Sequence, residues 1–187
     1  TNERTVISSV FPTYGTGDTL LLMYPTATID HSMFLPSIFS SFTLDYICRQ
    51  KIGGTHLKYN VFKQNAVLTP TQFSDEDVSW AKPRILELTY TSHSMRQWAE
   101  DLGYSGAPFA FDPDRRAQLR AELDAFFAKK YGLTKDELRY VLDPHDVKGS
   151  DYPSETFRGL KNKEIKQLGE YRTQRLVLEA FDRMTGG

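Results

Sequence analysis

The two parts of this 187-residue chain carry different sequence patterns, and the pattern changes near Ser74. Before that residue, short runs of β-branched and aromatic residues alternate with turn formers, as in small units that contain β-strands. After it, apolar residues recur at helical spacing over long stretches. The sequence therefore predicts an α+β fold, with a small β-containing unit over residues 1–73 followed by a mainly helical region over residues 74–187.

The first part begins with two strand-like runs. Residues 4–11 (RTVISSVF) and 19–24 (TLLLMY) are rich in β-forming residues. The segment between them is dense in turn formers, including Gly15 and Gly17, which predicts that the two strands pair in an antiparallel manner.

A helix is expected next. Pro36 suits the first turn of a helix that we expect over roughly residues 36–50, and Gly53-Gly54 is a suitable end for it. Beyond the glycines we expect one turn of helix around residues 61–62. A short strand is predicted at residues 66–68.

The second part carries clear helix signals. Ser74 and the three acidic residues after it resemble a helix start, and Thr134 with Glu137 forms a capping box. The helices that we expect cover residues 83–102 with an interruption at 89–94, then 114–131, 135–142, and two helices within 154–184 that separate near Gly169.

Composition excludes several classes of protein. The single cysteine rules out an internal disulfide framework and fits a reducing compartment, so we expect a cytoplasmic protein. No apolar run is long enough to cross a membrane, and no signal-peptide pattern is present. The chain begins with Thr1 and reaches strand-like sequence at once, so we expect it to be a segment of a longer protein.

Motifs for catalysis and for metal binding are missing from these residues. The segment around Gly15 and Gly17 lacks the spacing and the Lys-Ser/Thr pair of a phosphate loop, and no nucleophile elbow occurs. The four histidines lack a second ligand at i+3 or i+4. Asp143, His145 and Asp146 are close in sequence, but the pattern is more typical of a turn at a helix end than of a metal site. We therefore expect no catalytic residue, metal or cofactor in this segment.

Residues 46–74 contain no acidic residue, although a quarter of the chain is charged. Cations in this acid-free window can neutralise phosphates, while its polar side chains reach base edges or phosphate oxygens. The same pattern also fits a helix end whose cations complement the helix dipole, followed by a solvated loop. The candidate DNA-binding residues are Arg49, Lys51, Thr55, His56, Lys58, Asn60 and Lys63.

A second basic cluster lies near the end of the chain. It comprises Arg158, Lys161, Lys163, Lys166, Arg172 and Arg175. These cations can follow a phosphate backbone. The alternative is an ordinary charged helix face, in which the arginines form a salt-bridge network with Glu155, Glu170 or Glu179.

Three groups of residues together resemble one protein family. They are residues 49–57 with 62–64 and 68–70, then 122–125, 131–134 and 140–143, and finally 169–173 with 175–180. In combination they resemble the C-terminal region of the large bacterial restriction-modification DNA methyltransferases of the Eco57I-like, adenine-N6-methylating kind, an architecture that some phage-defence methylases share. The resemblance covers most of the chain.

The resemblance implies that residues 1–73 are the C-terminal part of a target-recognition unit that binds double-stranded DNA. The S-adenosylmethionine site and the methyltransferase motif Asn/Asp-Pro-Pro-Tyr/Phe are absent from these residues. They are expected in an upstream domain of the same chain, in a parent enzyme with or without a fused nuclease. The alternative is a structural module that binds protein within a restriction or phage-defence complex.

Overall fold

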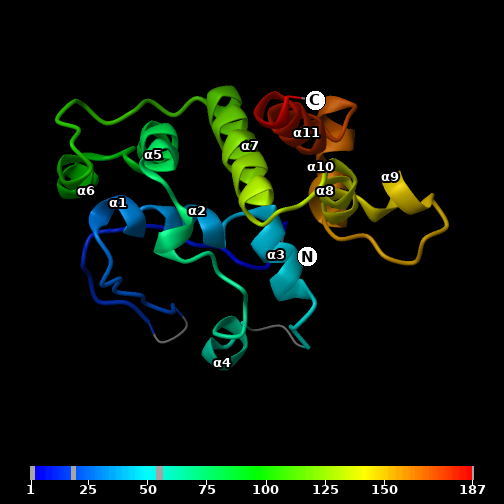
Figure 1. Ribbon diagram of the computed structural model, residues 1–187, viewed down its shortest axis with the longest axis horizontal. Coiled ribbons are helices and arrows are strands. Elements are labelled where there is room, and N and C mark those ends of the chain that lie inside the picture. The colour runs from blue at the N-terminus through cyan, green and yellow to red at the C-terminus, as the bar shows by residue number, and fades with distance from the viewer. Residues whose placement is uncertain (1–2, 18–19, 54–56, 187) are drawn as a thin grey trace.

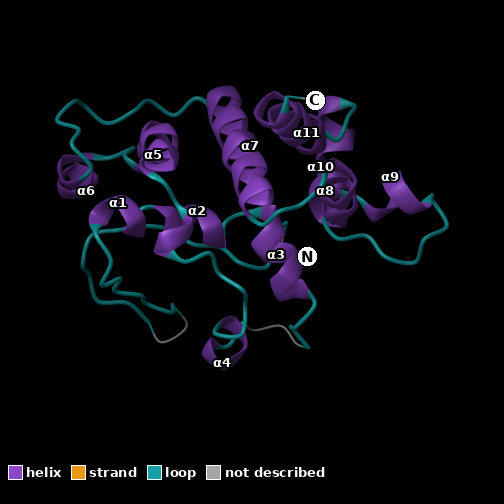
Figure 2. Ribbon diagram, viewed as in Figure 1, coloured by secondary structure: helices purple, strands orange, loops and turns teal. Residues whose placement is uncertain are grey.

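The computed structural model describes residues 3–17, 20–53 and 57–186, and the regular structure in these ranges is helical (Figures 1 and 2). The expected α+β fold is wrong for this part of the chain, because neither the two strands near the N-terminus nor the strand at residues 66–68 forms. The helices are α1 (Ile29–Ser32), α2 (Phe34–Phe39), α3 (Phe42–Arg49), α4 (Tyr59–Phe62), α5 (Asp75–Thr89), α6 (Arg96–Asp101), α7 (Pro113–Lys130), α8 (Lys135–Leu142), α9 (Pro144–Lys148), α10 (Arg158–Leu168) and α11 (Arg172–Thr185), with short 3-10 turns at Pro70–Gln72 and His93–Met95.

The first strand-like run is extended but binds to helices instead of pairing with another strand. The backbone N–H groups of Thr5 and Val6 both donate to the buried carboxylate of Asp45 in α3. The hydroxyl of Ser8 donates to the carbonyl of Pro36 in α2. Val6 itself is buried in the core. β-Propensity expresses the fit of a side chain to a half-buried surface, and here helices supply that surface.

The helix expected over residues 36–50 is divided into two. Pro36 lies in the first turn of α2 as expected, although the helix begins at Phe34, and the chain turns at Ser40 and Ser41. Ser41 caps α3 because its hydroxyl accepts a hydrogen bond of 3.3 Å from the N–H of Leu44. The break between α2 and α3 lets each helix bury its own apolar face.

The core consists of two clusters that meet on α7. In the first, the rings of Phe34, Phe73 and Phe126 are stacked, and Phe127 meets them edge-on. The second cluster joins α3, α7, α8 and α11, and α11 packs along the length of α7 (Figure 1). The first cluster contains residues on both sides of position 73, so the two sequence regions share a core.

The helix signals in the second part of the chain are confirmed. Ser74 and Asp77 form a capping box at the start of α5, and Thr134 and Glu137 form another at the start of α8. The interruption expected at residues 89–94 separates α5 from α6. Gly169 ends α10 with φ of +79°, a left-handed conformation that glycine adopts without strain.

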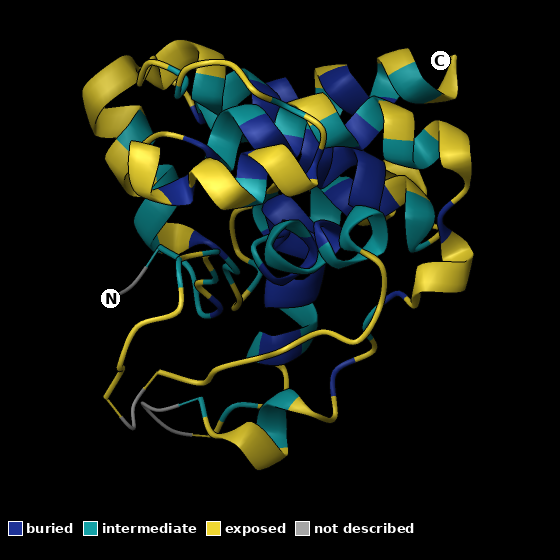
Figure 3. Cartoon of the chain, turned by 90° about the vertical axis from the view of Figure 1, so that its left-hand side faces the viewer, coloured by how far each residue is buried: buried dark blue, intermediate teal, exposed yellow. Residues whose placement is uncertain are grey.

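Two segments extend away from the helical body on the same side. They are α4 and the irregular chain that precedes α1, and both lie below the other helices in Figures 1 and 3. Figure 3 shows that both are largely exposed. Within the described ranges, the helices are all too short or too polar to cross a bilayer.

Candidate nucleic-acid interface

The acid-free window runs from the last turn of α3 through α4 to the 3-10 turn at Pro70–Gln72. Its apolar side chains anchor it to the body: Cys48 and Leu68 are buried, and Phe62 packs edge-on against Phe39 of α2. Most of its polar side chains face outward, although Asn65 is buried. Lys51, Lys58, Asn60, Lys63 and Gln64 are exposed.

The exposed lysines of the window contact carbonyl and aromatic groups rather than carboxylates. The ammonium of Lys51 donates to the carbonyl of Gln64, and that of Lys63 lies 4.3 Å from the ring centre of Tyr59. Among the described residues, no ion pair includes Lys51, Lys58 or Lys63. Their positive charges are thus uncompensated in this part of the structure.

Arg49 differs from these lysines because its guanidinium is used inside the protein. Its Nε pairs with Asp45, its Nη1 donates to the carbonyl of Thr156 at 2.8 Å, and its Nη2 donates to the carbonyl of Glu3 at 3.2 Å. The guanidinium carbon lies 4.6 Å from the ring centre of Phe157. Arg49 therefore joins α3 to two distant segments and has little capacity left for a phosphate.

Of the other candidate residues of the window, the structure describes Asn60. Asn60 is exposed on α4, and its backbone carbonyl accepts a hydrogen bond from the side chain of Gln64 at 3.0 Å. Thr55 and His56 lie outside the described residues. The described candidates that face outward are thus three lysines and the amide of Asn60.

The second basic cluster forms ion pairs with carboxylates from several segments. The pairs are Arg158–Glu155 (3.4 Å), Lys161–Asp143 (2.7 Å), Lys163–Glu3 (2.7 Å), Arg172–Asp114 (2.9 Å), Arg175–Glu170 (2.9 Å) and Arg175–Glu179 (3.1 Å). The pairing of Arg175 with Glu170 and Glu179 matches the structural alternative considered for this cluster. Lys166 is the member without a carboxylate partner among the described residues.

A group of potential metal ligands, which the sequence did not predict, lies beside this cluster. One ligand atom each from Asp143, His145 and Glu155 lies within 4.8 Å of the others. The ammonium of Lys161 stands 2.7 Å from Asp143 and 3.4 Å from Glu155. It therefore supplies the positive charge that these carboxylates require. Sequence spacing placed Asp143 and His145 close together, with Asp146, but it gave no signal for Glu155, which comes from a separate loop.

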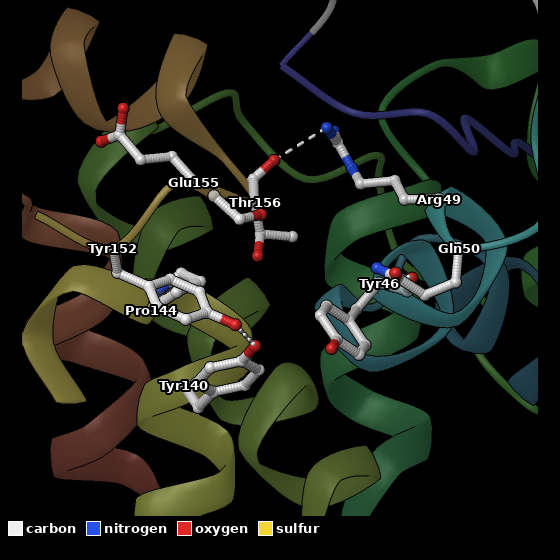
Figure 4. Close-up of a pocket in the computed structure, with 9 residues that line it drawn as sticks. Tyr46, Arg49, Gln50, Tyr140, Pro144, Tyr152, Glu155 and Thr156 are labelled. Atoms are coloured by element: carbon white, nitrogen blue, oxygen red, sulfur yellow. Dashed lines mark hydrogen bonds between the residues drawn. The ribbon is translucent and has the colours of Figure 1, made fainter. Parts of the chain in front are cut away.

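The same loop closes a pocket of about 520 Å³ against α3 and α8 (Figure 4). Tyr46 and Gln50 of the α3 segment face Tyr140 and Tyr152 across it. The hydroxyls of Tyr140 and Tyr152 are hydrogen-bonded to each other at 2.9 Å. No local sequence pattern indicates this pocket, because its walls come from segments about a hundred residues apart.

Comparison with protein-family models, with curated proteins and with solved structures found no match to this chain.

Proposed function

We propose that this chain is the DNA-target recognition segment of a larger bacterial adenine-N6 DNA methyltransferase and that it is not catalytic by itself. The observation that supports this proposal most is the contrast between two groups of cations. Lys51, Lys58 and Lys63 are exposed and unpaired among the described residues, whereas most cations of the second basic cluster are neutralised by carboxylates. A surface that keeps cations without carboxylate partners is suited to an anionic ligand.

In the proposed mechanism the three lysines contact phosphates of duplex DNA. Each contact releases condensed counterions and so makes the affinity dependent on salt. The amide of Asn60 lies on α4 between Lys58 and Lys63, and that of Gln64 directly follows Lys63. Amides of this kind can hydrogen-bond base edges. The lysines would then hold the duplex, and the amides would contribute to the choice of site.

Catalysis is assigned to the upstream domain that the resemblance implies. That domain would bind S-adenosylmethionine and take the target adenine out of the base stack. In the described segment, the helical body would brace α4 and the window against the catalytic domain. The shared core on both sides of residue 73 supports such a bracing role, because displacement of α2 or α3 would disturb packing on α7.

Fluorescence anisotropy with a labelled DNA duplex over a series of salt concentrations tests this proposal. We expect affinity that falls steeply with salt, and we expect Lys51→Ala, Lys58→Ala and Lys63→Ala each to reduce the salt slope by about one. Lys129→Ala is the matched control, because Lys129 lies at the end of α7 and donates to the carbonyl of Met184. Equal affinity of all four variants and the unaltered chain would refute DNA binding through the window.

A second candidate function is a protein-binding module of a restriction or phage-defence complex. It is favoured by an exposed apolar run before α1, in which Leu20, Leu21, Leu22, Met23 and Tyr24 are each more than two-fifths exposed. Contiguous exposed apolar side chains commonly mark a protein interface. If substitutions in this run or in the helical body abolish assembly with a partner while the lysine variants do not alter DNA binding, this second function is the correct one.

A further inference from the structure

The apolar run before α1 exposes all of its side chains. Leu20, Leu21, Leu22, Met23 and Tyr24 are 49%, 45%, 43%, 49% and 73% exposed. Successive side chains of an extended chain point to opposite sides, so exposure of all five means that neither side packs on the helical body. Figures 1 and 3 show the segment that carries the run reaching away from the helices. The run is therefore accessible to another molecule.

The backbone of the run is also without partners. Residues 21–26 contain no helix, turn or bend, and among the described residues none of them takes part in a backbone–backbone hydrogen bond. The first strand-like run differs, because Thr5 and Val6 donate to Asp45 and Val6 is buried. An exposed chain with free N–H and C=O groups is a template for pairing with another strand.

We propose that residues 20–24 pair as an antiparallel strand with the same residues of a second copy of this chain. Pairing about a two-fold axis at Leu22 places Leu22 opposite its counterpart and Leu21 opposite Met23. Apolar side chains then meet across the strands on both sides of the ribbon, and such cross-strand pairs are the units that stabilise a sheet. This inference goes beyond the proposed function and does not depend on DNA binding.

The charge pattern favours a second copy over a different partner. Residues 19–29 contain no charged residue. A two-fold interface brings the same surface of both copies together, so a charged run would repel itself, whereas an uncharged apolar run is complementary to itself. Native strand edges are commonly protected from such pairing by lysine or other charged side chains, and this run has none. Nothing in the composition of the run therefore opposes its own pairing.

The short length of the run limits the strength of the pairing. Pro25 has no N–H to donate, so the paired strand ends there. A standard protein interface uses roughly 20–30 residues on each side, and the run falls well below that number. We therefore expect a reversible dimer with a dissociation constant on the order of 10–100 μM.

Sedimentation velocity of the full chain without DNA, over a concentration range of about 5 to 500 μM, tests the proposal. The sedimentation coefficient should rise toward that of a dimer. Leu22→Lys and Leu22→Glu should each weaken the pairing at least about tenfold, because like charges then face each other at the two-fold axis. An equal mixture of the two variants should regain the dimer, because opposite charges then face each other. The infrared amide I band of β-structure should grow with the dimer, since the described residues of the single chain form no strand.

Leu168→Lys is the matched control, because Leu168 is a leucine of α10 that is 51% exposed and lies outside the run. This variant should dimerise as the unaltered chain does. A chain that stays monomeric throughout the series, a dimer that both Leu22 variants leave intact, a mixture that stays monomeric, or a dimer without the β-structure band would each overturn the pairing. Because no DNA is present, failure of the strand pairing and failure of the lysine surface are distinguishable.

Discussion

The buried carboxylate of Asp124 in α7 accepts a hydrogen bond of 2.7 Å from the backbone N–H of Phe42, the first residue of α3. The guanidinium of Arg4 lies 3.5 Å from the other oxygen of the carboxylate and over the ring of Phe42. One side chain of the central helix thus connects the N-terminal segment with the helix that opens the acid-free window. Burial raises the pKa of Asp124 from its ordinary value of 3.8 to about 6.

This raised pKa predicts a specific pH dependence of stability. Below about pH 4 Asp124 is protonated in both the folded and the unfolded protein, and its contribution to the free energy of unfolding is fully present. Between about pH 4 and pH 6 the unfolded chain releases this proton while the folded protein keeps it. The contribution falls by up to about 3 kcal/mol as the pH rises through 6. Asp124→Asn keeps an acceptor for Phe42 but does not titrate. In urea denaturation from pH 3.5 to 7, the free energy of unfolding of the variant minus that of the unaltered chain should rise with pH. A constant difference would contradict the assignment.

Asp45 should contribute strongly to stability. Its fully buried carboxylate accepts hydrogen bonds from the N–H groups of Thr5 and Val6, at 2.6 and 3.0 Å, and pairs with Arg49. Asp45→Ala leaves these donors without an acceptor, which should cost about 3 kcal/mol or more in urea denaturation. Asp30→Ala removes a half-exposed aspartate of α1 whose partner is Lys82, and it should cost less than about 1 kcal/mol. Equal losses in the two variants would argue against the role given to Asp45.

Lys161 should stabilise the carboxylates beside the second basic cluster. Lys161→Gln removes the ammonium between Asp143 and Glu155, and we expect the free energy of unfolding at pH 7 to fall by about 2 kcal/mol. Lys166→Gln is the control on the same helix, and it should change stability by less than about 0.5 kcal/mol because Lys166 has no carboxylate partner in the described residues. Chemical denaturation of both variants measures the difference, and a larger loss for Lys166→Gln would show that the pairing does not hold in solution.

Replacement of Gly169 by alanine should lower stability more than the same replacement of Gly53. Its φ of +79° at the end of α10 is strained for any residue with a Cβ, so Gly169→Ala should lower stability by about 1 kcal/mol and the melting temperature by a few degrees. Gly53 has no positive φ, and a Cβ there meets no other atom within 4 Å. Thermal melts of Gly169→Ala and Gly53→Ala compare the two. A Gly53 variant that melts as low as the Gly169 variant would contradict this explanation.

Local signals were sufficient to predict most of the helices after Ser74. The capping boxes at Ser74 and Thr134 and the glycine at 169 each act within a few residues, so sequence spacing reveals them. Within residues 114–131, Leu119, Leu123 and Phe127 recur at helical spacing, and all three are buried on the core-facing side of α7.

The strand prediction failed because pairing is not a local property. Residues 4–11 have the composition of a strand, but Asp45, from a helix about forty residues later, takes the hydrogen bonds of Thr5 and Val6. Similarly, the helix expected over residues 36–50 is broken where Asp124 of α7 accepts the N–H of Phe42. Partners so distant in sequence leave no periodicity near the segments that they redirect.

In the candidate site, too, some properties follow from the sequence alone and others from tertiary packing. The sequence by itself determined that the window around Lys51, Lys58 and Lys63 carries cations without acids, because composition is a property of the chain alone. Only the tertiary structure decided which of its cations remain available. It brought the carbonyls of Glu3 and Thr156 to Arg49, which also pairs with Asp45 one helical turn earlier, and so removed that arginine from the exposed set. It also gathered Tyr46, Tyr140 and Tyr152 into one pocket, since aromatic residues a hundred positions apart can meet only when the helices that carry them pack.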